Sequence, residues 1–121
     1  MHEAGIALNL IEAVQQRLES DPGARVAAIH VRVGELAGVS TDALDFAFEC
    51  LAAETPLAGA KLVFDRVPLL VACEDCGRTT PVEDLVFRCG ACGSERTRVS
   101  SGRELEVRTL ELVEEHEVAH A

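Results

Sequence analysis

The first part of the chain repeats apolar residues with the period of an α-helix. The apolar positions between residues 3 and 20 are Ile6, Ala7, Leu10, Ile11, Val14 and Leu18. Such a stripe is typical of a helix that has one face on a core. The segment Ser20-Asp21-Pro22-Gly23 then contains residues that end a helix and turn the chain. We therefore predict a first helix over residues 3–20.

A second stripe with the same period consists of Leu44, Ala47, Phe48 and Leu51. Ser40 or Thr41 can cap the start of this helix, because a short hydroxyl side chain accepts a hydrogen bond from a backbone N–H of the first turn. Pro56 lies just beyond the stripe, where a proline cannot continue a helix. Cys50 lies beside this stripe and is interpreted as a packed small hydrophobe rather than a metal ligand.

Three longer segments show the two-residue alternation of β-strands. These segments are residues 26–33, 62–65 and 103–113. The third segment changes parity between Val107 and Leu110, which predicts a bulge or a strong twist near Thr109. Shorter and weaker strands are expected over residues 78–82 and 85–88.

The first of these strands should place one face on a core and the other face toward water. Its apolar side carries Ile29, Val31 and Val33, and its other side carries Ala28, His30 and Arg32. His30 is therefore interpreted as a surface or sheet residue.

Two helices and three longer strands predict an α+β fold, in which a small antiparallel sheet of about three strands carries both helices on one face. The last strand follows a cysteine-rich segment and should return to the first sheet. This expectation places residues 1–68 and 103–121 in one discontinuous α+β domain. Residues 69–102 then form an inserted module.

The cysteine-rich segment contains two Cys-x-x-Cys pairs, which are Cys73 with Cys76 and Cys89 with Cys92. Two such pairs supply four thiolates for one tetrahedral Zn²⁺ ion. A glycine follows each pair, where it allows the tight turn through which backbone N–H groups reach the sulfurs. We predict a zinc-ribbon-like module, and the alternatives are four unrelated buried thiols or a disulfide.

A Zn²⁺ ion with four cysteine ligands has no open coordination position for water, which is typical of a structural site. The sequence contains no GxSxG motif and no phosphate-binding glycine loop. We therefore do not expect an enzyme.

The chain is acidic, with 21 Asp and Glu against 11 Lys and Arg and a formal net charge of −10. This charge disfavours nucleic acid as a partner, since nucleic acid attracts clustered basic residues. No apolar run reaches the roughly 20 residues of a membrane span, and the N-terminus lacks the features of a secretory signal. Metal-binding cysteines that stay reduced indicate the cytoplasm.

Two other readings of the cysteine pairs remain open. One is a zinc ribbon that only binds nucleic acid or protein. Binding of nucleic acid predicts a basic or aromatic surface, yet the charges of residues 73–98 nearly cancel. A rubredoxin-like iron site would need an aromatic core, and the chain has no Trp, no Tyr and four Phe.

Met1-His2-Glu3 is a second candidate metal site. An α-amine, backbone nitrogens that can deprotonate and an imidazole are nitrogen donors that favour Ni²⁺ or Cu²⁺ in square-planar geometry. Taken alone, a histidine near a terminus is more often an ordinary solvated residue. His116 and His120 are four residues apart and could chelate a metal on one helix face, but a solvated acidic tail is the preferred interpretation.

Several motifs follow one another in order between residue 1 and about residue 113. They are Met1-His2-Glu3, Arg32-Val33-Gly34-Glu35-Leu36 with Gly38-Val39, Ala43-Leu44-Asp45-Phe46-Ala47-Phe48-Glu49, the two CxxCG turns, and Ser101-Gly102-Arg103-Glu104-Leu105. Together they resemble the HypA/HybF family of nickel-insertion accessory proteins for [NiFe]-hydrogenase. Ala4-Gly5 departs from the larger residues expected after the first motif.

The resemblance implies a nickel metallochaperone with a structural zinc site. Ni²⁺ would bind at Met1 and His2, through the imidazole and nearby backbone nitrogens, with help from the side chain of Glu3. The discontinuous α+β domain would then be the nickel-binding domain.

The implied partners are a nickel-handling GTPase of the same maturation pathway and the [NiFe]-hydrogenase large-subunit precursor. Some relatives also serve urease, which adds urease maturation proteins as partners. A homodimer is left open, and neither nucleic acid nor a membrane is expected as a partner.

Overall fold

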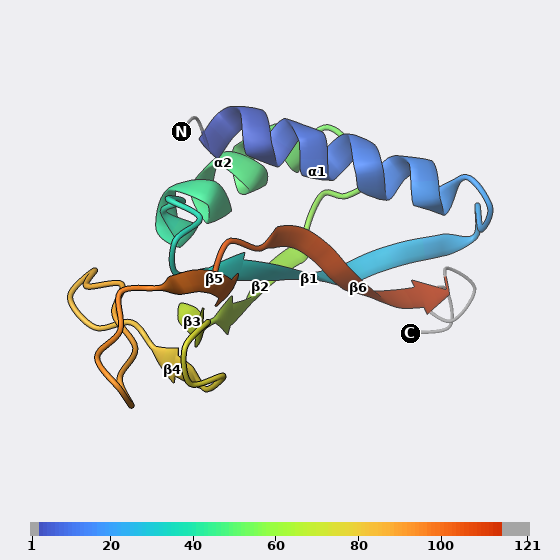
Figure 1. Cartoon of the computed structure of the whole chain (residues 1–121). Helices are drawn as coiled ribbons and strands as arrows, with labels where there is room; N and C mark the ends of the chain where they lie inside the picture. Colours follow the sequence, from blue (N-terminus) through green and yellow to red (C-terminus); the bar gives the residue numbers. More distant parts are fainter. Residues whose placement is uncertain (1–2, 115–121) are drawn as a thin grey trace. The chain divides into compact units, whose positions relative to one another are not determined.

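The structure is a computed structural model that describes residues 3–114. It contains α1 (Glu3–Leu18), β1 (Ala24–Gly34), α2 (Thr41–Ala52), β2 (Lys61–Val67), β3 (Leu70–Cys73), β4 (Thr79–Pro81), β5 (Thr97–Ser101) and β6 (Leu105–Glu114) (Figure 1). Among these described elements, neither helix has the length and apolar character needed to cross a membrane.

The strands form two sheets, with the orders β2-β1-β6 and β4-β3-β5. The contact of His30 with Glu111 and the hydrogen bond of Gly34 N to Glu104 O show that β1 and β6 run antiparallel. In the second sheet β3 pairs antiparallel with both of its neighbours. The predicted α+β class is confirmed, and the last strand returns to the first sheet as expected.

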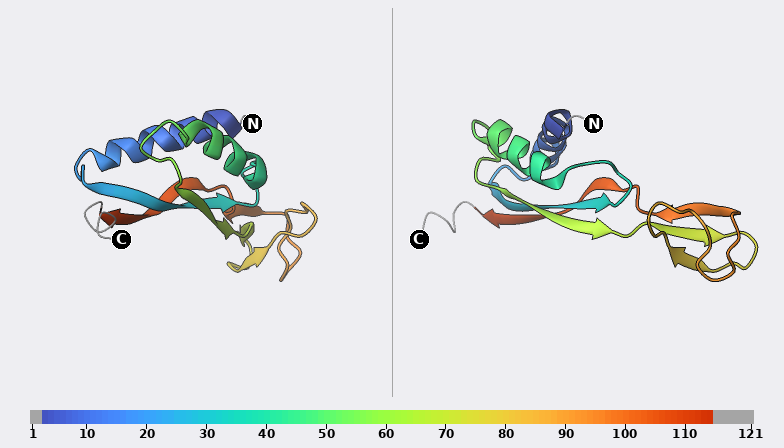
Figure 2. Two further views of the ribbon diagram at one scale, coloured as in Figure 1. Left: turned by 180° about the vertical axis from the view of Figure 1, so that it is seen from behind. Right: turned by 90° about the vertical axis from the view of Figure 1, so that its left-hand side faces the viewer.

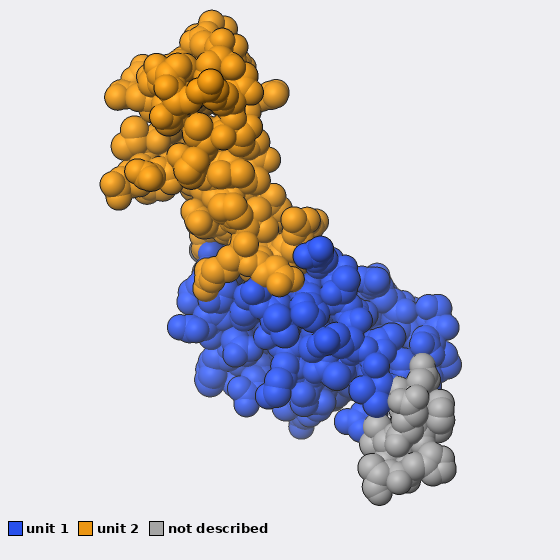
Figure 3. Space-filling view, turned by 90° about the horizontal axis from the view of Figure 1, so that it is seen from below, with its two compact units in different colours: residues 1–31, 39–64, 107–121 blue, residues 32–38, 65–106 orange. Residues whose placement is uncertain are grey.

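The chain divides into two compact units, which Figure 3 colours separately. Unit 1 comprises Met1–Val31, Val39–Phe64 and Val107–Ala121, and unit 2 comprises Arg32–Gly38 and Asp65–Glu106. Unit 2 overlaps the expected inserted module at 69–102 and also includes the loop after β1. The expected domain boundaries themselves stay a prediction.

In unit 1 both helices lie on the same side of the sheet (Figure 2). The buried residues of α1 are Ala7, Leu10, Ile11 and Val14, all members of the predicted stripe. Helix α2 begins after Ser40, whose side chain accepts a hydrogen bond from Ala43 N and so confirms the predicted cap. Phe48 of α2 is the largest fully buried side chain of the described residues.

The buried stripe of α2 is narrower than the one predicted. Leu44, Phe48 and Ala52 are buried, whereas Leu51 is 41% exposed and Cys50 is exposed. Positions four residues apart cover only a narrow arc of a helix, so residues on its flank remain in solvent. The prediction that Cys50 packs in the core is therefore wrong.

Ala28 of β1 is also more buried than expected. It was placed on the wetter face of the strand, yet it is 7% exposed. Because β1 is the middle strand of its sheet, the larger side chains of both neighbouring strands can cover a methyl group.

The weak strand expected over residues 85–88 does not form. Val86 N donates to Glu83 O at 3.0 Å, and Asp84 and Leu85 between them have φ values of 52° and 58°. A turn with positive φ at both central positions reverses the chain here. Such a turn usually contains Asn or Gly, which is why the sequence did not predict it.

Two glycines allow a close approach of two chain segments within unit 2. A Cβ on Gly34 would lie 2.0 Å from the carbonyl oxygen of Gly102 and 2.6 Å from Arg103 N. Leu36 N donates to that same carbonyl oxygen at 2.7 Å. The motifs around Gly34 and Gly102, which lie far apart in the sequence, are therefore parts of one backbone junction.

We predict that Gly34→Ala lowers the free energy of unfolding by about 2 kcal/mol or more, because the new methyl group overlaps backbone atoms that cannot move aside. Gly5→Ala is the matched control. Gly5 lies in α1 with nothing within 4 Å of an added Cβ, so the change should stabilise the helix by up to about 1 kcal/mol. Denaturant titration of both variants measures this, and a Gly34→Ala protein as stable as the native one would contradict the junction.

Candidate metal centre

Four cysteine side chains come together in unit 2. The sulfurs of Cys73, Cys76, Cys89 and Cys92 all lie within 4.8 Å of one another. Two of the separations, Cys73 to Cys92 and Cys76 to Cys89, are 3.6 Å. A disulfide needs about 2 Å, whereas sulfurs about 2.3 Å from a tetrahedral Zn²⁺ lie about 3.8 Å apart. Within residues 3–114 this is the one cluster of three or more candidate ligands, and its geometry suits zinc.

Backbone N–H groups point at the first sulfur of each pair. Asp75 N and Cys76 N lie 3.3 Å and 3.4 Å from Cys73 Sγ. The second pair repeats these distances, since Ala91 N and Cys92 N lie 3.3 Å and 3.4 Å from Cys89 Sγ. Such N–H groups stabilise a thiolate and orient it toward a metal.

The glycine after each pair makes this geometry accessible. Gly77 and Gly93 have φ values of 78° and 76°, a conformation that is unfavourable for residues with a Cβ. Gly77 N donates to Cys73 O at 3.0 Å, and Gly93 N donates to Cys89 O at 2.9 Å. The predicted role of these two glycines is confirmed.

The electrostatics of the site favour thiolates at its two buried positions. The N–H of Cys92, followed by that of Ala91, lowers the pKa of the Cys89 thiol to about 6, against partial desolvation. The pKa of Cys73 is lowered in the same way, first by the N–H of Cys76. The N–H of Ser94 acts to lower the pKa of Cys92, yet the neighbouring thiols, Cys73 first, and desolvation raise it to about 12. A divalent cation removes this competition, since it allows all four groups to ionise together.

Hydrogen bonds between the two turns brace the site. Asp75 accepts from Ser94 Oγ and, at 2.8 Å, from Arg96 Nη1. Thr80 Oγ1 of β4 accepts from Gly90 N at 2.9 Å. Sequence reasoning missed these supporting residues, because nothing in their spacing marks contacts that join segments 10 to 21 residues apart.

Glu3 is the one member of the N-terminal motif within the described residues. Met1 and His2 lie outside them, as do His116 and His120 of the tail. Glu3 Oε2 accepts a hydrogen bond from Ser40 N at 3.1 Å. This places a carboxylate of α1 at the start of α2, where the helix dipole favours negative charge.

His30 belongs to the sheet rather than to either candidate site. Its Nε2 lies 3.4 Å from a carboxylate oxygen of Glu111, and its side chain is 26% exposed. The expectation of a surface or sheet residue is confirmed.

The fold and the site define a small α+β protein with a zinc-ribbon-like module, in which four cysteines form a cluster whose geometry suits a metal ion. The family model described as "Hydrogenase/urease nickel incorporation, metallochaperone, hypA" matches residues 1–112. The chain belongs to this HypA family.

Curated relatives and solved structures agree with this membership. "Hydrogenase maturation factor HypA" of Desulfatibacillum aliphaticivorans is 37% identical over 122 residues, which cover 100% of this chain and 94% of the relative. The protein of the same name from Roseiflexus sp. (strain RS-1) is 41% identical over 112 residues, 92% of this chain and 91% of the relative. The "Ni metallochaperone HypA from Helicobacter pylori" shares the fold, with a TM-score of 0.66, 22% identity, and coverage of 94% and 99%.

Family membership supports a role in nickel incorporation for hydrogenase or urease. It also fits the expectation that the chain is not an enzyme, because the curated relatives are named as maturation factors. A nucleic-acid-binding zinc ribbon is not favoured.

We predict that Cys89→Ser removes bound zinc and much of the amide hydrogen-exchange protection of unit 2. Structural zinc supplies about 10–16 kcal/mol of folding free energy in zinc-finger peptides. Cys50→Ser is the matched control and should keep one zinc per chain, because Cys50 lies outside the cluster. Elemental analysis and hydrogen exchange measure both effects, and zinc retained in Cys89→Ser or lost in Cys50→Ser would contradict the assignment.

Proposed function

We propose that this chain is a nickel metallochaperone that binds Ni²⁺ at Met1, His2 and Glu3 and helps deliver it to the [NiFe]-hydrogenase large-subunit precursor. Zn²⁺ at the four cysteines has a structural role in this proposal. The observation that carries it is the family match, which covers residues 1–112 and therefore includes the N-terminal motif.

The geometry of the cysteine cluster argues against that site as the cargo site. Four sulfurs complete a tetrahedral shell, so an incoming ligand finds no open position. The sulfurs of Cys73 and Cys89 each accept two backbone hydrogen bonds, and these two residues are only 4% and 3% exposed. A metal held in this way is retained rather than passed on.

The N-terminal motif offers the opposite chemistry. In-plane nitrogen donors from the α-amine, the backbone and the His2 imidazole suit Ni²⁺ and leave both axial positions open. A receiving protein can then replace the ligands one at a time. The hydrogen bond from Ser40 N to Glu3 supports this arrangement, because it fixes the residue that follows His2 to the start of α2.

The proposed partners are a nickel-handling GTPase of the maturation pathway and the large-subunit precursor, with urease maturation proteins as further candidates. The description of the family names both hydrogenase and urease, which supports partners from the maturation of either enzyme. We place the protein in the cytoplasm, where four metal-binding thiols stay reduced.

We predict that His2→Ala weakens Ni²⁺ binding by about 100-fold or more while the zinc content stays unchanged, because one nitrogen ligand is lost and the cysteines are intact. Acetylation of the α-amine should have a similar effect. Calorimetric titration of tag-free protein measures both.

The matched control for this titration is the double variant His116→Ala/His120→Ala, which should bind nickel as the native chain does. Nickel binding that survives His2→Ala and disappears in the tail variant would move the site to the tail. Equal affinity of the native and the acetylated protein would remove the α-amine from the site.

We also predict that Glu3→Ala weakens Ni²⁺ binding by about tenfold, which corresponds to about 1.4 kcal/mol. Alanine removes the acceptor for Ser40 N, whereas Glu3→Gln keeps a carbonyl oxygen in its place. If the residue acts by positioning the motif, Glu3→Gln should retain most of the affinity. Equal losses in the two variants would assign the effect to the carboxylate charge instead.

A further inference from the structure

Helix α2 carries a second apolar stripe that the core does not use. Its buried side is formed by Leu44, Phe48 and Ala52. The exposed and half-buried apolar residues are Ala43, Phe46, Ala47, Cys50 and Leu51. Their spacing of three and four residues is that of a helix face that packs against another element. Phe46 is 69% exposed, so this outer face of α2 presents a large aromatic side chain to solvent.

The outer face of α2 is also hollowed. It forms one side of a groove of about 480 Å³ whose other side is made by Glu3 and Ala4 of α1. Leu8 lies one turn after Ala4 on the same face of α1 and is 47% exposed. Small side chains beside an exposed phenyl ring leave room for apolar side chains of a partner to enter.

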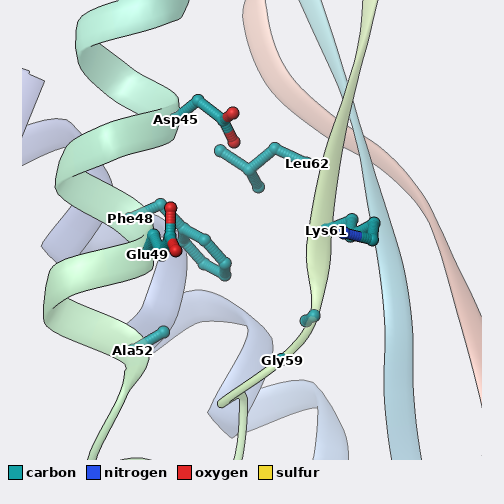
Figure 4. Close-up of a pocket in the computed structure, with 8 residues that line it drawn as sticks. Asp45, Phe48, Glu49, Ala52, Gly59, Lys61 and Leu62 are labelled. Atoms are coloured by element: carbon teal, nitrogen blue, oxygen red, sulfur yellow. The ribbon is translucent and has the colours of Figure 1, made fainter.

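An acidic stripe borders the apolar one. Asp42, Asp45 and Glu49 are exposed. Asp42 and Glu49 lie four residues before and three residues after Phe46 and are its neighbours on the helix surface, whereas Asp45 lies further round the helix. Among the ion pairs of the described residues, none involves these three carboxylates. In Figure 4 Asp45 and Glu49 stand on the helix side of a hollow of about 250 Å³, and Lys61 of β2 points away from them.

We propose that the outer face of α2 docks a basic amphipathic helix of a partner protein. Leucine-like side chains of that helix would enter the groove beside Phe46, and its Lys or Arg residues would meet Asp42 and Glu49. An apolar stripe with a charged border is the surface that helix-in-groove recognition uses, and the sign of the border selects the partner.

Charge complementarity favours a basic helix over a second copy of the chain, anionic lipid or nucleic acid as the occupant of this face. A second copy of the chain would bring its own acidic stripe against Asp42 and Glu49. Anionic lipid and nucleic acid are repelled for the same reason, and the chain as a whole carries a formal charge of −10. A basic protein segment is the occupant that the surface favours.

The groove reaches Glu3, so a docked helix would lie beside one of the proposed nickel-binding residues. This link to nickel rests on the proposed function, whereas the docking itself does not. The docking test therefore uses zinc-loaded protein without nickel, and its failure would leave the result of the nickel titration unchanged.

The probe is a fluorescein-labelled helical peptide of about four turns, with leucines along one side and lysines along their borders. A twin peptide has glutamates in place of the lysines. Fluorescence polarisation should show that the native protein binds the lysine peptide at least about tenfold more tightly than the twin. Phe46→Ser should weaken that binding about tenfold or more, as expected for an aromatic anchor.

Two matched variants control for exposure and charge. Leu85→Ser removes an equally exposed side chain, 69%, from unit 2 and should leave peptide binding unchanged. Asp42→Asn/Glu49→Gln should weaken binding and reduce its salt dependence. Glu12→Gln/Glu19→Gln changes the net charge by the same amount at exposed positions of α1 and the residue after it. This variant should change neither the affinity for the peptide nor its salt dependence.

Equal binding by Phe46→Ser and Leu85→Ser would overturn the proposal, as would equal affinity for the two peptides or no binding of either. Sedimentation that shows a dimer dependent on Phe46 would assign the face to a second copy instead. Circular dichroism of each variant should match the native spectrum, since all the substituted side chains are exposed.

Discussion

Four sulfur atoms within 4.8 Å of one another are the constraint on which unit 2 depends. Thiolates at such distances repel one another, so a bound cation is needed to hold them together. The surrounding chain supports this arrangement through N–H groups aimed at Cys73 and Cys89 and through Asp75, which joins the two turns. Around the turns the apolar side chains of Leu85, Val86 and Phe87 are exposed, so they contribute little to a core. In our account metal binding would stabilise the part of unit 2 around the cysteine turns, where few apolar side chains are buried.

The two halves of the structure thus serve different kinds of metal chemistry in our account. A closed sulfur shell holds zinc, and in unit 1 a conventional apolar core between helices and sheet holds the segment that follows His2. The contact of Glu3 with Ser40 connects that segment to the start of α2. The same helix presents Phe46 and its acidic neighbours to solvent, so nickel binding and partner docking would share one end of one unit.

The sequence predicted the features that arise from local rules. The stripe of α1, the cap at Ser40 and the cysteine turns with Gly77 and Gly93 each follow from residues within a few positions of one another. The sequence did not predict features that need a distant partner, such as the pairing of β3 with β5 or the contact of Gly34 with Gly102. The sequence did not predict the exposure of Cys50, because the spacing of apolar residues does not show which of them pack against the core.

The central claim is that zinc and nickel occupy different sites with different ligands. X-ray absorption of the protein loaded with both metals tests this most directly, because each absorption edge reports the neighbours of one element. The account predicts four sulfur neighbours about 2.3 Å from zinc and a nickel shell of nitrogen and oxygen without sulfur. Sulfur scattering at the nickel edge, or fewer than four sulfurs around zinc, would contradict it.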